Sequence, residues 1–154
     1  MSSYEGYVEF PLGCLKLEAD DQHLLAVSYC AEKDRDNPNW IIRKAQKQLR
    51  EYFGGQRKTF SLPLVITGSD FRRRIYEAMA LVPYGSTVSY RDLTYMAGNR
   101  RGFQAAGQAV HNNPYMIILP CHRVIKHDGS LGGYAGREDI KRYLLQLEGT
   151  ILDQ

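Results

Sequence analysis

The residues with the clearest capacity for chemistry lie in one stretch, ILPCHRVIKHDGSLGGYAG, which runs from Ile118 to Gly136. Cys121 follows an apolar run and stands between Pro120 and His122. A buried cysteine is most often an inert small hydrophobe, but polar groups placed directly after a core segment are costly unless they are paired or functional. The thiolate is the nucleophilic form of cysteine, and a histidine can serve as the base that generates it. The pattern therefore predicts that Cys121 is a nucleophile and His122 its base.

Adjacency limits how this pair can work. Neighbouring side chains on an extended segment point to opposite faces, and on a helix they diverge by about 100°. We therefore expect His122 to reach Cys121 through a bridging water rather than directly. A base also needs an orienting partner, and Glu148, at the end of an otherwise apolar helix, is the best candidate. A solvated helix end is the alternative reading of Glu148.

The other cysteines carry weaker signals. Cys14 and Cys30 each fall within a predicted strand and read as small hydrophobic residues. Together with His23 they do not form a convincing zinc ligand set, so no metal is expected. The three cysteines form no C-x-x-C motif, which favours reduced thiols in a cytoplasmic setting, or a nuclear one in a eukaryote.

Length and composition bound the class of protein. The 154 residues, 44% apolar and 24% charged, suit a globular protein with one core or two small domains. No apolar run approaches the ~20 residues of a membrane span, and the first residues do not resemble a signal peptide, so no membrane association is expected. The net charge of +3 lies wholly after Ser69, with eleven basic against eight acidic residues there. This bias permits a polyanionic partner without requiring one.

The first sixty residues read as three short strands and a helix. Residues 7–10 and 14–17 flank a turn, and residues 23–29 follow an Asp-Asp break. Apolar residues then recur at helical spacing from Ile41 to Tyr52. We expect an antiparallel sheet packed on a helix, with a ribonuclease-H-like outline, over residues 1–66.

The remainder, residues 67–154, reads as a mostly helical domain. Helices are predicted after Ser69, after Ser89 in a capping-box-like S-x-x-D, from Phe103 to His111, and from Glu138 to Glu148. The second and third of these have the outline of a winged-helix-like helix-turn-helix, a pattern shared with ordinary helical hairpins. The fold class expected for the chain is therefore α+β.

The helix FQAAGQAVHN has small side chains where a major-groove reader needs hydrogen-bonding ones. Such a helix can bring its backbone close to a partner, and equally to another helix. If the partner is DNA, shape and backbone contacts should dominate over sequence readout.

The motifs resemble those of a known family. Pro120-Cys121-His122-Arg123-Val124 is similar to the active-site signature of the O6-alkylguanine-DNA alkyltransferases, also called methylated-DNA–protein-cysteine methyltransferases. The resemblance extends over residues 70–149, whereas the first half is similar only in outline. The other matching positions are Pro83-Tyr84-Gly85, Val88-Ser89-Tyr90, Asn113-Pro114, Gly133-Tyr134-Ala135-Gly136, Lys141, Leu144-Leu145 and Glu148-Gly149.

The resemblance implies an enzyme that transfers an alkyl group from O6 of guanine, and also O4 of thymine, to its own cysteine. Each molecule would act once, as a monomer, on double-stranded DNA held by its minor groove with the nucleotide flipped out, and without cofactor or metal. The implied catalytic residues are Cys121, His122, Glu148, Tyr90 and Asn113. The implied substrate-binding residues are Val124, Tyr134, Ala135 and Gly136, with the main-chain carbonyls of Cys121 and Val124 reading the exocyclic amine. The implied DNA contacts are Ser89, Arg101, Gln104, Ala105, Gly107, Gln108 and Arg123.

One position departs from the family. Ten residues before Pro114 the family usually has an arginine that fills the gap left by the flipped base, and this chain has Gln104. Three other functions stay open: a lesion-binding protein without chemistry, a cysteine hydrolase with turnover, and a plain helix-turn-helix regulator. The presence of Cys121 argues against the first, and the small-sided second helix argues against the last.

Overall fold

A computed structural model describes residues 3–98, 102–134 and 136–150 of the chain. The chain forms two compact units. One comprises the residues up to Val65 together with Pro114–Ile118, and the other comprises Ile66–Asn113 and the described residues from Leu119 onward. In chain order the elements are β1 (Tyr4–Phe10), β2 (Gly13–Ala19), β3 (Leu24–Cys30), α1 (Trp40–Phe53), α2 (Asp70–Ala80), β4 (Val88–Ser89), α3 (Tyr90–Met96), α4 (Phe103–His111), the 3₁₀ turn η1 (Cys121–Arg123), β5 (Val124–Ile125) and α5 (Glu138–Leu147).

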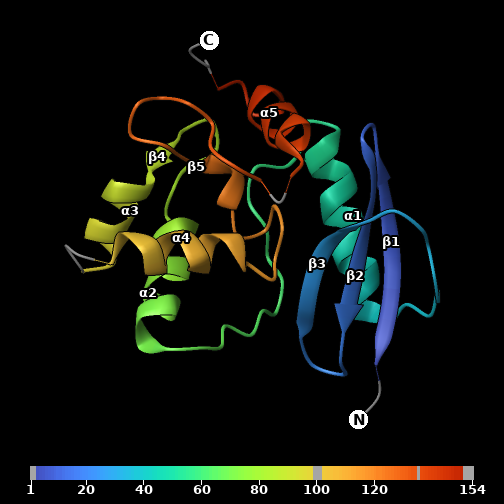
Figure 1. Cartoon of the computed structure of the whole chain (residues 1–154). Helices are drawn as coiled ribbons and strands as arrows, with labels where there is room; N and C mark the ends of the chain where they lie inside the picture. Colours follow the sequence, from blue (N-terminus) through green and yellow to red (C-terminus); the bar gives the residue numbers. More distant parts are fainter. Residues whose placement is uncertain (1–2, 99–101, 135, 151–154) are drawn as a thin grey trace. The chain divides into compact units, whose positions relative to one another are not determined.

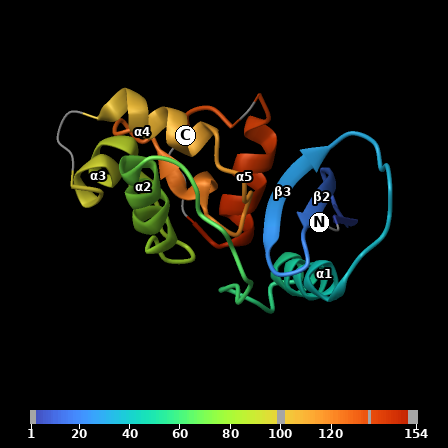
Figure 2. The same cartoon turned by 90° about the horizontal axis from the view of Figure 1, so that it is seen from below.

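The first unit is an antiparallel sheet in the order β1-β2-β3, with α1 packed on one face (Figures 1 and 2). The side chain of Asn39 caps α1 by accepting a hydrogen bond from the backbone N–H of Ile42 at 3.0 Å. The helix can lie close to β1 because Gly6 has no side chain. A Cβ at this position would come within 2.4 Å of the Ile42 side chain. The predicted apolar stripe is fully buried, and its members are Ile41, Ala45, Leu49 and Tyr52.

Residues Pro114–Ile118 belong to the first unit, whereas the sequence placed them in the second domain. The backbone of Val27 in β3 holds this segment, since it donates to the Pro114 carbonyl at 2.8 Å and accepts from the Met116 N–H at 3.0 Å. The buried hydroxyl of Tyr115 donates to the Leu24 carbonyl at 2.5 Å. The chain then passes through Ile117 with a φ of 74°, a conformation that β-branched residues rarely adopt. The segment leading to Cys121 is thus fixed by β3.

The second unit contains α2, α3, α4 and α5, and its first three helices pack on one another (Figure 1). The predicted caps are present: Ser69 accepts from Arg72 N–H at 3.1 Å, and Ser89 accepts from Asp92 N–H at 3.0 Å. The bounds of α4 are those predicted, from Phe103 to His111. The core is apolar, and its fully buried members include Ile75, Met79, Leu93, Ala106, Ile140, Leu144 and Leu145. The α+β fold class is confirmed.

A short parallel pairing joins two distant parts of this unit. Val88 pairs with Val124 and Ser89 pairs with Ile125, so β4 and β5 lie side by side. Because α3 begins directly after β4 and η1 ends directly before β5, the pairing places the start of α3 beside the turn that carries Cys121. None of the helices in the described residues is both long and apolar enough to span a membrane.

Candidate active site

Cys121 is the first residue of a 3₁₀ turn that ends the buried run of Ile117 and Leu119. The turn is closed by a hydrogen bond from the Arg123 N–H to the Pro120 carbonyl at 2.9 Å. A 3₁₀ turn has three residues per revolution, so successive side chains diverge by about 120°. The side chains of Cys121, His122 and Arg123 therefore point in three directions, and all three are buried.

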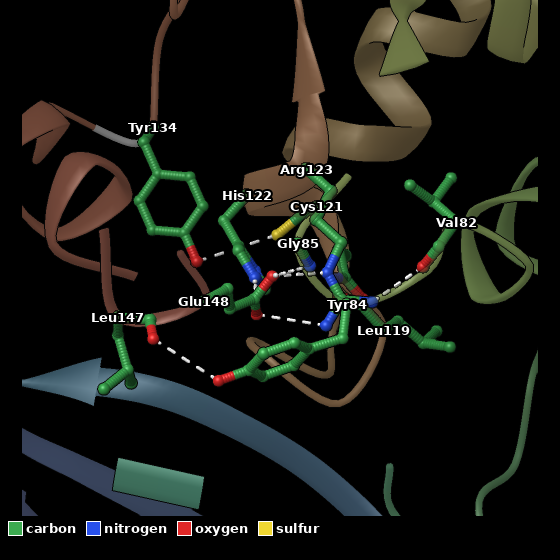
Figure 3. Close-up of polar contacts among 11 residues, drawn as sticks. Val82, Tyr84, Gly85, Leu119, Cys121, His122, Arg123, Tyr134, Leu147 and Glu148 are labelled. Carbon is green, nitrogen blue, oxygen red and sulfur yellow. Dashed lines mark hydrogen bonds and ion pairs between the residues drawn. The ribbon is translucent and has the colours of Figure 1, made fainter. Parts of the chain in front are cut away.

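Two polar side chains contact the sulfur of Cys121. Its Sγ atom lies 3.8 Å from the hydroxyl of Tyr134, and the side chain of Asn113 also hydrogen-bonds to it (Figure 3 shows the tyrosine contact). The Asn113 amide is held in turn, because its Nδ2 donates to the Leu119 carbonyl at 2.8 Å. Burial raises the pKa of the Cys121 thiol, and the contacts with Asn113, Tyr134 and the charge of Lys141 oppose that rise. The site thus hides the thiol from water while providing groups that stabilise its anion.

The carboxylate of Glu148 joins His122 and Arg123 in one buried cluster (Figure 3). Its Oε2 atom lies 2.7 Å from His122 Nε2 and 3.0 Å from Arg123 Nη2, and its Oε1 atom lies 2.8 Å from Arg123 Nε. The remaining guanidinium nitrogen of Arg123 donates to the Val82 carbonyl at 2.7 Å. A bidentate guanidinium supplies the counter-charge that a buried carboxylate requires.

This cluster fixes the protonation of the histidine ring. Burial lowers the pKa of His122, and although Glu148 opposes this effect, the ring is neutral at neutral pH. A carboxylate accepts hydrogen bonds, so Nε2 carries the ring proton and Nδ1 presents a lone pair. Nδ1 is buried and has no hydrogen-bond partner among the described residues. The ring therefore makes no direct hydrogen bond to Cys121, as its adjacency in sequence predicted, and its basic nitrogen is available to accept a proton.

Two residues of the segment before β4 support Glu148. The backbone N–H of Gly85 points at Oε1 at 3.5 Å, and the Tyr84 hydroxyl donates to the Leu147 carbonyl at 3.3 Å. Gly85 has a φ of +85°, and an added Cβ would lie 3.3 Å from the Glu148 carbonyl oxygen. Glycine is required there by both conformation and space. The Tyr84 ring also lies under Arg123, with 5.8 Å between the guanidinium carbon and the ring centroid.

A fully buried lysine, which sequence reasoning did not assign to the site, lies beside it. Lys141 Nζ donates to the Val124 carbonyl at 2.6 Å and lies 5.9 Å from the centroid of the Tyr90 ring. Burial lowers the pKa of Lys141 from 10.5 to about 8, and the Cys121 thiolate acts in the opposite direction. The sequence did contain one indication that Lys141 is buried: it follows Ile140 and lies on the same face of the helix as Leu144. Lys141 contributes positive charge near the sulfur.

The lowered pKa of Lys141 should make the stability of the protein depend on pH. Because the pKa of Lys141 is lower in the folded chain, the unfolded chain binds more protons here between pH 8 and pH 10.5. Its contribution to stability is therefore complete above pH 10.5 and is lost as the pH falls through 8. From about pH 7.5 to about pH 9.5, the free energy of unfolding of the wild type should rise relative to Lys141→Met by on the order of 2 kcal/mol. Urea denaturation at both pH values measures this, with the exposed Lys126→Met as control. If the wild type and Lys141→Met differ in free energy of unfolding by the same amount at both pH values, the prediction is contradicted.

The structure places the other predicted site residues as follows. Tyr90 is half-buried at the start of α3. Its pKa is raised mainly by burial and to a smaller extent by the charge of Cys121. The Cys121 and Val124 carbonyls each already accept one hydrogen bond, from Val124 N–H and from Lys141, which leaves each a second lone pair. Gly136 is exposed. Arg101 and Ala135 lie outside the described residues.

The predicted DNA-contacting side of α4 is exposed. Gln104, Ala105 and Gln108 are exposed, Gly107 is half-buried, and a Cβ at Gly107 would meet nothing within 4 Å. The opposite side buries Ala106 and Ala109. The sequence suggested that the small residues of α4 allow close approach either to a partner or to another helix. Both hold, since some of these residues pack inward and others leave the backbone of α4 open to a partner. Ser89 uses its hydroxyl to cap α3.

The expectation that Arg123 contacts DNA is wrong. Its side chain is 8% exposed, and Nε, Nη1 and Nη2 are engaged with Glu148 and the Val82 carbonyl. Removing it from this cluster would leave a buried carboxylate without its counter-charge. Arg123 instead holds Glu148 in place. No cluster of three or more His, Cys, Asp or Glu side chains suited to a metal occurs in the described residues.

Comparison with known proteins covers both units. Residues 3–66 match the family "6-O-methylguanine DNA methyltransferase, ribonuclease-like domain", and residues 70–150 match "6-O-methylguanine DNA methyltransferase, DNA binding domain". The methylated-DNA–protein-cysteine methyltransferase of Methanosarcina barkeri is 38% identical over 152 residues, which cover 94% of this chain and 96% of that protein. The constitutive enzyme of Bacillus subtilis is 36% identical over 160 residues, covering 95% of each.

A solved structure shows the same fold. The crystal structure of Mycobacterium tuberculosis OGT in complex with DNA matches with a TM-score of 0.85 and 34% identity, covering 94% of this chain and 92% of that one. The match therefore includes the sheet unit as well as the unit that carries Cys121. Together with the two family matches, it establishes that this chain belongs to the 6-O-methylguanine DNA methyltransferase family, the methylated-DNA–protein-cysteine methyltransferases.

Proposed function

We propose that this chain repairs DNA by moving an alkyl group from O6 of guanine, and from O4 of thymine, irreversibly onto Cys121. The observation that carries the proposal is the buried thiol of Cys121 beside the His122–Glu148 pair, in which the His122 Nδ1 lone pair is engaged by none of the described residues. Titratable groups arranged with a nucleophile in this way characterise covalent catalysis.

The first step generates the nucleophile. A water bridging Cys121 Sγ and His122 Nδ1 passes the thiol proton to the ring, and the resulting imidazolium is stabilised by the Glu148 carboxylate at 2.7 Å. Lys141 and the hydroxyl of Tyr134 stabilise the thiolate. The sulfur then attacks the saturated carbon of the alkyl group, the carbon–oxygen bond breaks, and its electron pair passes to the base.

The second requirement is a stabilised leaving group. The Tyr90 hydroxyl has a raised pKa, so it stays protonated at neutral pH and can donate to the departing base. The base takes one proton from Tyr90, and the His122 ring returns the proton of the thiol to Tyr90 through solvent, so the proton lost by the thiol ends on the base. The product is a thioether, which water does not hydrolyse, so each molecule reacts once.

DNA reaches this site through α4. The target atom lies within the base stack, so the nucleotide has to be flipped out. The exposed face of α4, with Gln104, Ala105 and Gln108, suits close approach to the minor groove, where shape and backbone contacts dominate.

Stoichiometry separates this proposal from its alternatives. A duplex with one O6-methylguanine, in molar excess over the protein, should be converted to guanine until one lesion per chain is repaired, and then the reaction should stop. Repeated turnover would point to hydrolysis. Tight binding with the methyl group left on the base would identify a lesion-binding protein that signals to other repair factors, which is the second candidate function.

Gln104 predicts that DNA engagement can be improved. Glutamine is shorter than arginine and neutral, so it fills a gap in the stack less well and attracts phosphate less strongly. Gln104→Arg should therefore tighten duplex binding or speed repair by severalfold, with a steeper salt dependence. Gln108→Arg, one turn further along the same exposed face, is the matched control. Slower repair and weaker binding by Gln104→Arg would show that the position is used differently.

A further inference from the structure

Two cysteines face each other across β2 and β3. Cys14 and Cys30 are direct partners in the antiparallel register of these strands. Directly opposed residues in a sheet project from the same face, and both thiols are free. The two thiols also interact electrostatically, since Cys30 is one of the groups that raise the pKa of Cys14. The fold therefore brings together two thiols that are well separated in sequence.

The backbone spacing at this position suits a covalent link. Opposed residues of an antiparallel pair have Cα atoms about 4.5–5.5 Å apart, and disulfides span about 4.4–6.8 Å between Cα atoms. The pair lies at the end of the β2–β3 ladder, where β3 stops at Cys30. Closing the bond there requires no movement of one strand past the other. The register does not offer any comparable partner to Cys121, which lies in the other unit.

We propose that Cys14 and Cys30 form a redox-active dithiol that is converted to an intramolecular disulfide by small-molecule disulfides such as oxidised glutathione. This site is separate from the alkyl-transfer chemistry and uses none of its residues. In a reducing compartment the dithiol form prevails, and the disulfide forms when the supply of oxidised small thiols rises.

The order of steps follows from exposure. Cys30 is half-buried and Cys14 is buried, so the Cys30 thiolate is the one that attacks a sulfur of the small disulfide. That attack releases one small thiolate and leaves a mixed disulfide on Cys30. The Cys14 thiolate then attacks the Cys30 sulfur and releases the second small thiolate. The two protons lost by the cysteines end on the two released thiols, so the exchange is balanced.

The surroundings of Cys14 make it the resolving thiol. Burial raises the pKa of Cys14 to about 11, with a further rise from its contact with Cys30, and the nearby charge of Lys33 partly opposes both. A thiol with so high a pKa is a slow nucleophile toward outside reagents. Its attack on the sulfur of the directly opposed Cys30 is intramolecular, and proximity compensates for the small thiolate fraction.

The linkage can be read directly on the full wild-type chain. The protein is incubated with oxidised glutathione, denatured, treated with iodoacetamide to cap free thiols, and mapped by mass spectrometry without reduction. We expect a chain that has gained one carbamidomethyl group and lost two hydrogens, with a linked peptide pair containing Cys14 and Cys30 and the cap on Cys121. Glutathione retained on Cys30, a link to Cys121, or three capped cysteines would overturn the proposal.

Stability provides a second measurement with matched variants. The new bond constrains the unfolded chain between Cys14 and Cys30, so the thermal midpoint should rise by roughly 5–10 °C on oxidation and fall again with dithiothreitol. Cys14→Ser and Cys30→Ser should show no such rise, whereas Cys121→Ser should show it in full. An equal rise in Cys30→Ser would overturn the proposal. Because no DNA is present, failure here leaves the proposed alkyl transfer untouched.

Discussion

Cys121→Ser should abolish alkyl transfer, with a loss of at least about 10⁴-fold, the order seen when covalent enzymes lose their nucleophile. A serine hydroxyl is a weak nucleophile at its free pKa, and His122 acting through a water cannot compensate for the lost polarizable sulfur. The side chain is of similar shape, and the new hydroxyl can keep the contacts with Asn113 and Tyr134. The variant should therefore fold normally and still bind a methylated duplex. Single-turnover repair assays and duplex binding on the same sample measure both quantities.

The control for this experiment is Cys30→Ser, which changes a half-buried thiol in the other unit. It should transfer the alkyl group at the wild-type rate under reducing conditions. Measurable repair by Cys121→Ser, or equal loss in Cys30→Ser, would show that the acceptor has been assigned to the wrong residue.

Glu148→Gln should be both destabilised and slow. Glutamine has nearly the same shape, but it removes the charge that balances buried Arg123 and the acceptor that orients His122. Breaking a buried ion pair by neutralising one partner costs about 3–5 kcal/mol. Loss of an oriented general base lowers the rate by about 10²–10⁴-fold. Urea denaturation gives the first quantity, and single-turnover repair at a temperature where the variant is folded gives the second.

Glu77→Gln makes the same chemical change at an exposed position of α2 and should alter neither quantity. The variant Arg123→Met distinguishes the two roles of the cluster, since it removes the counter-charge but leaves the contact between His122 and Glu148 possible. We expect it to lose stability as Glu148→Gln does, with a smaller loss in rate. A Glu148→Gln variant as active and as stable as the wild type would contradict the assigned cluster.

Local features of the fold were predictable because their causes are local. Ser69 and Ser89 cap helices by hydrogen bonds that span three residues, and α4 begins and ends where its apolar spacing does. The apolar stripe of α1 follows from the same periodicity. The pairing of Val88–Ser89 with Val124–Ile125 was not foreseen, since two-residue strands far apart in sequence leave no periodic signal.

The site was only partly predictable for a related reason. Chemistry and adjacency indicated Cys121 and His122, and the scarcity of nearby carboxylates indicated Glu148. Arg123 was assigned to DNA from the resemblance alone, and nothing near it in the sequence indicated its buried partner, which lies 25 residues away. Lys141 was missed because a lysine in a helix is normally solvated. A buried charge is defined by its partners, which only the folded chain brings together.

The most direct test is to locate the alkyl group after reaction. Wild-type protein is incubated with excess duplex containing O6-methylguanine, and the intact chain and its peptides are weighed. The account predicts a gain of one methyl group, saturating at one per chain and carried by the Cys121 peptide as a thioether. An unmodified chain after the lesion has disappeared, a methyl group on another residue, or several lesions repaired by each chain would contradict it.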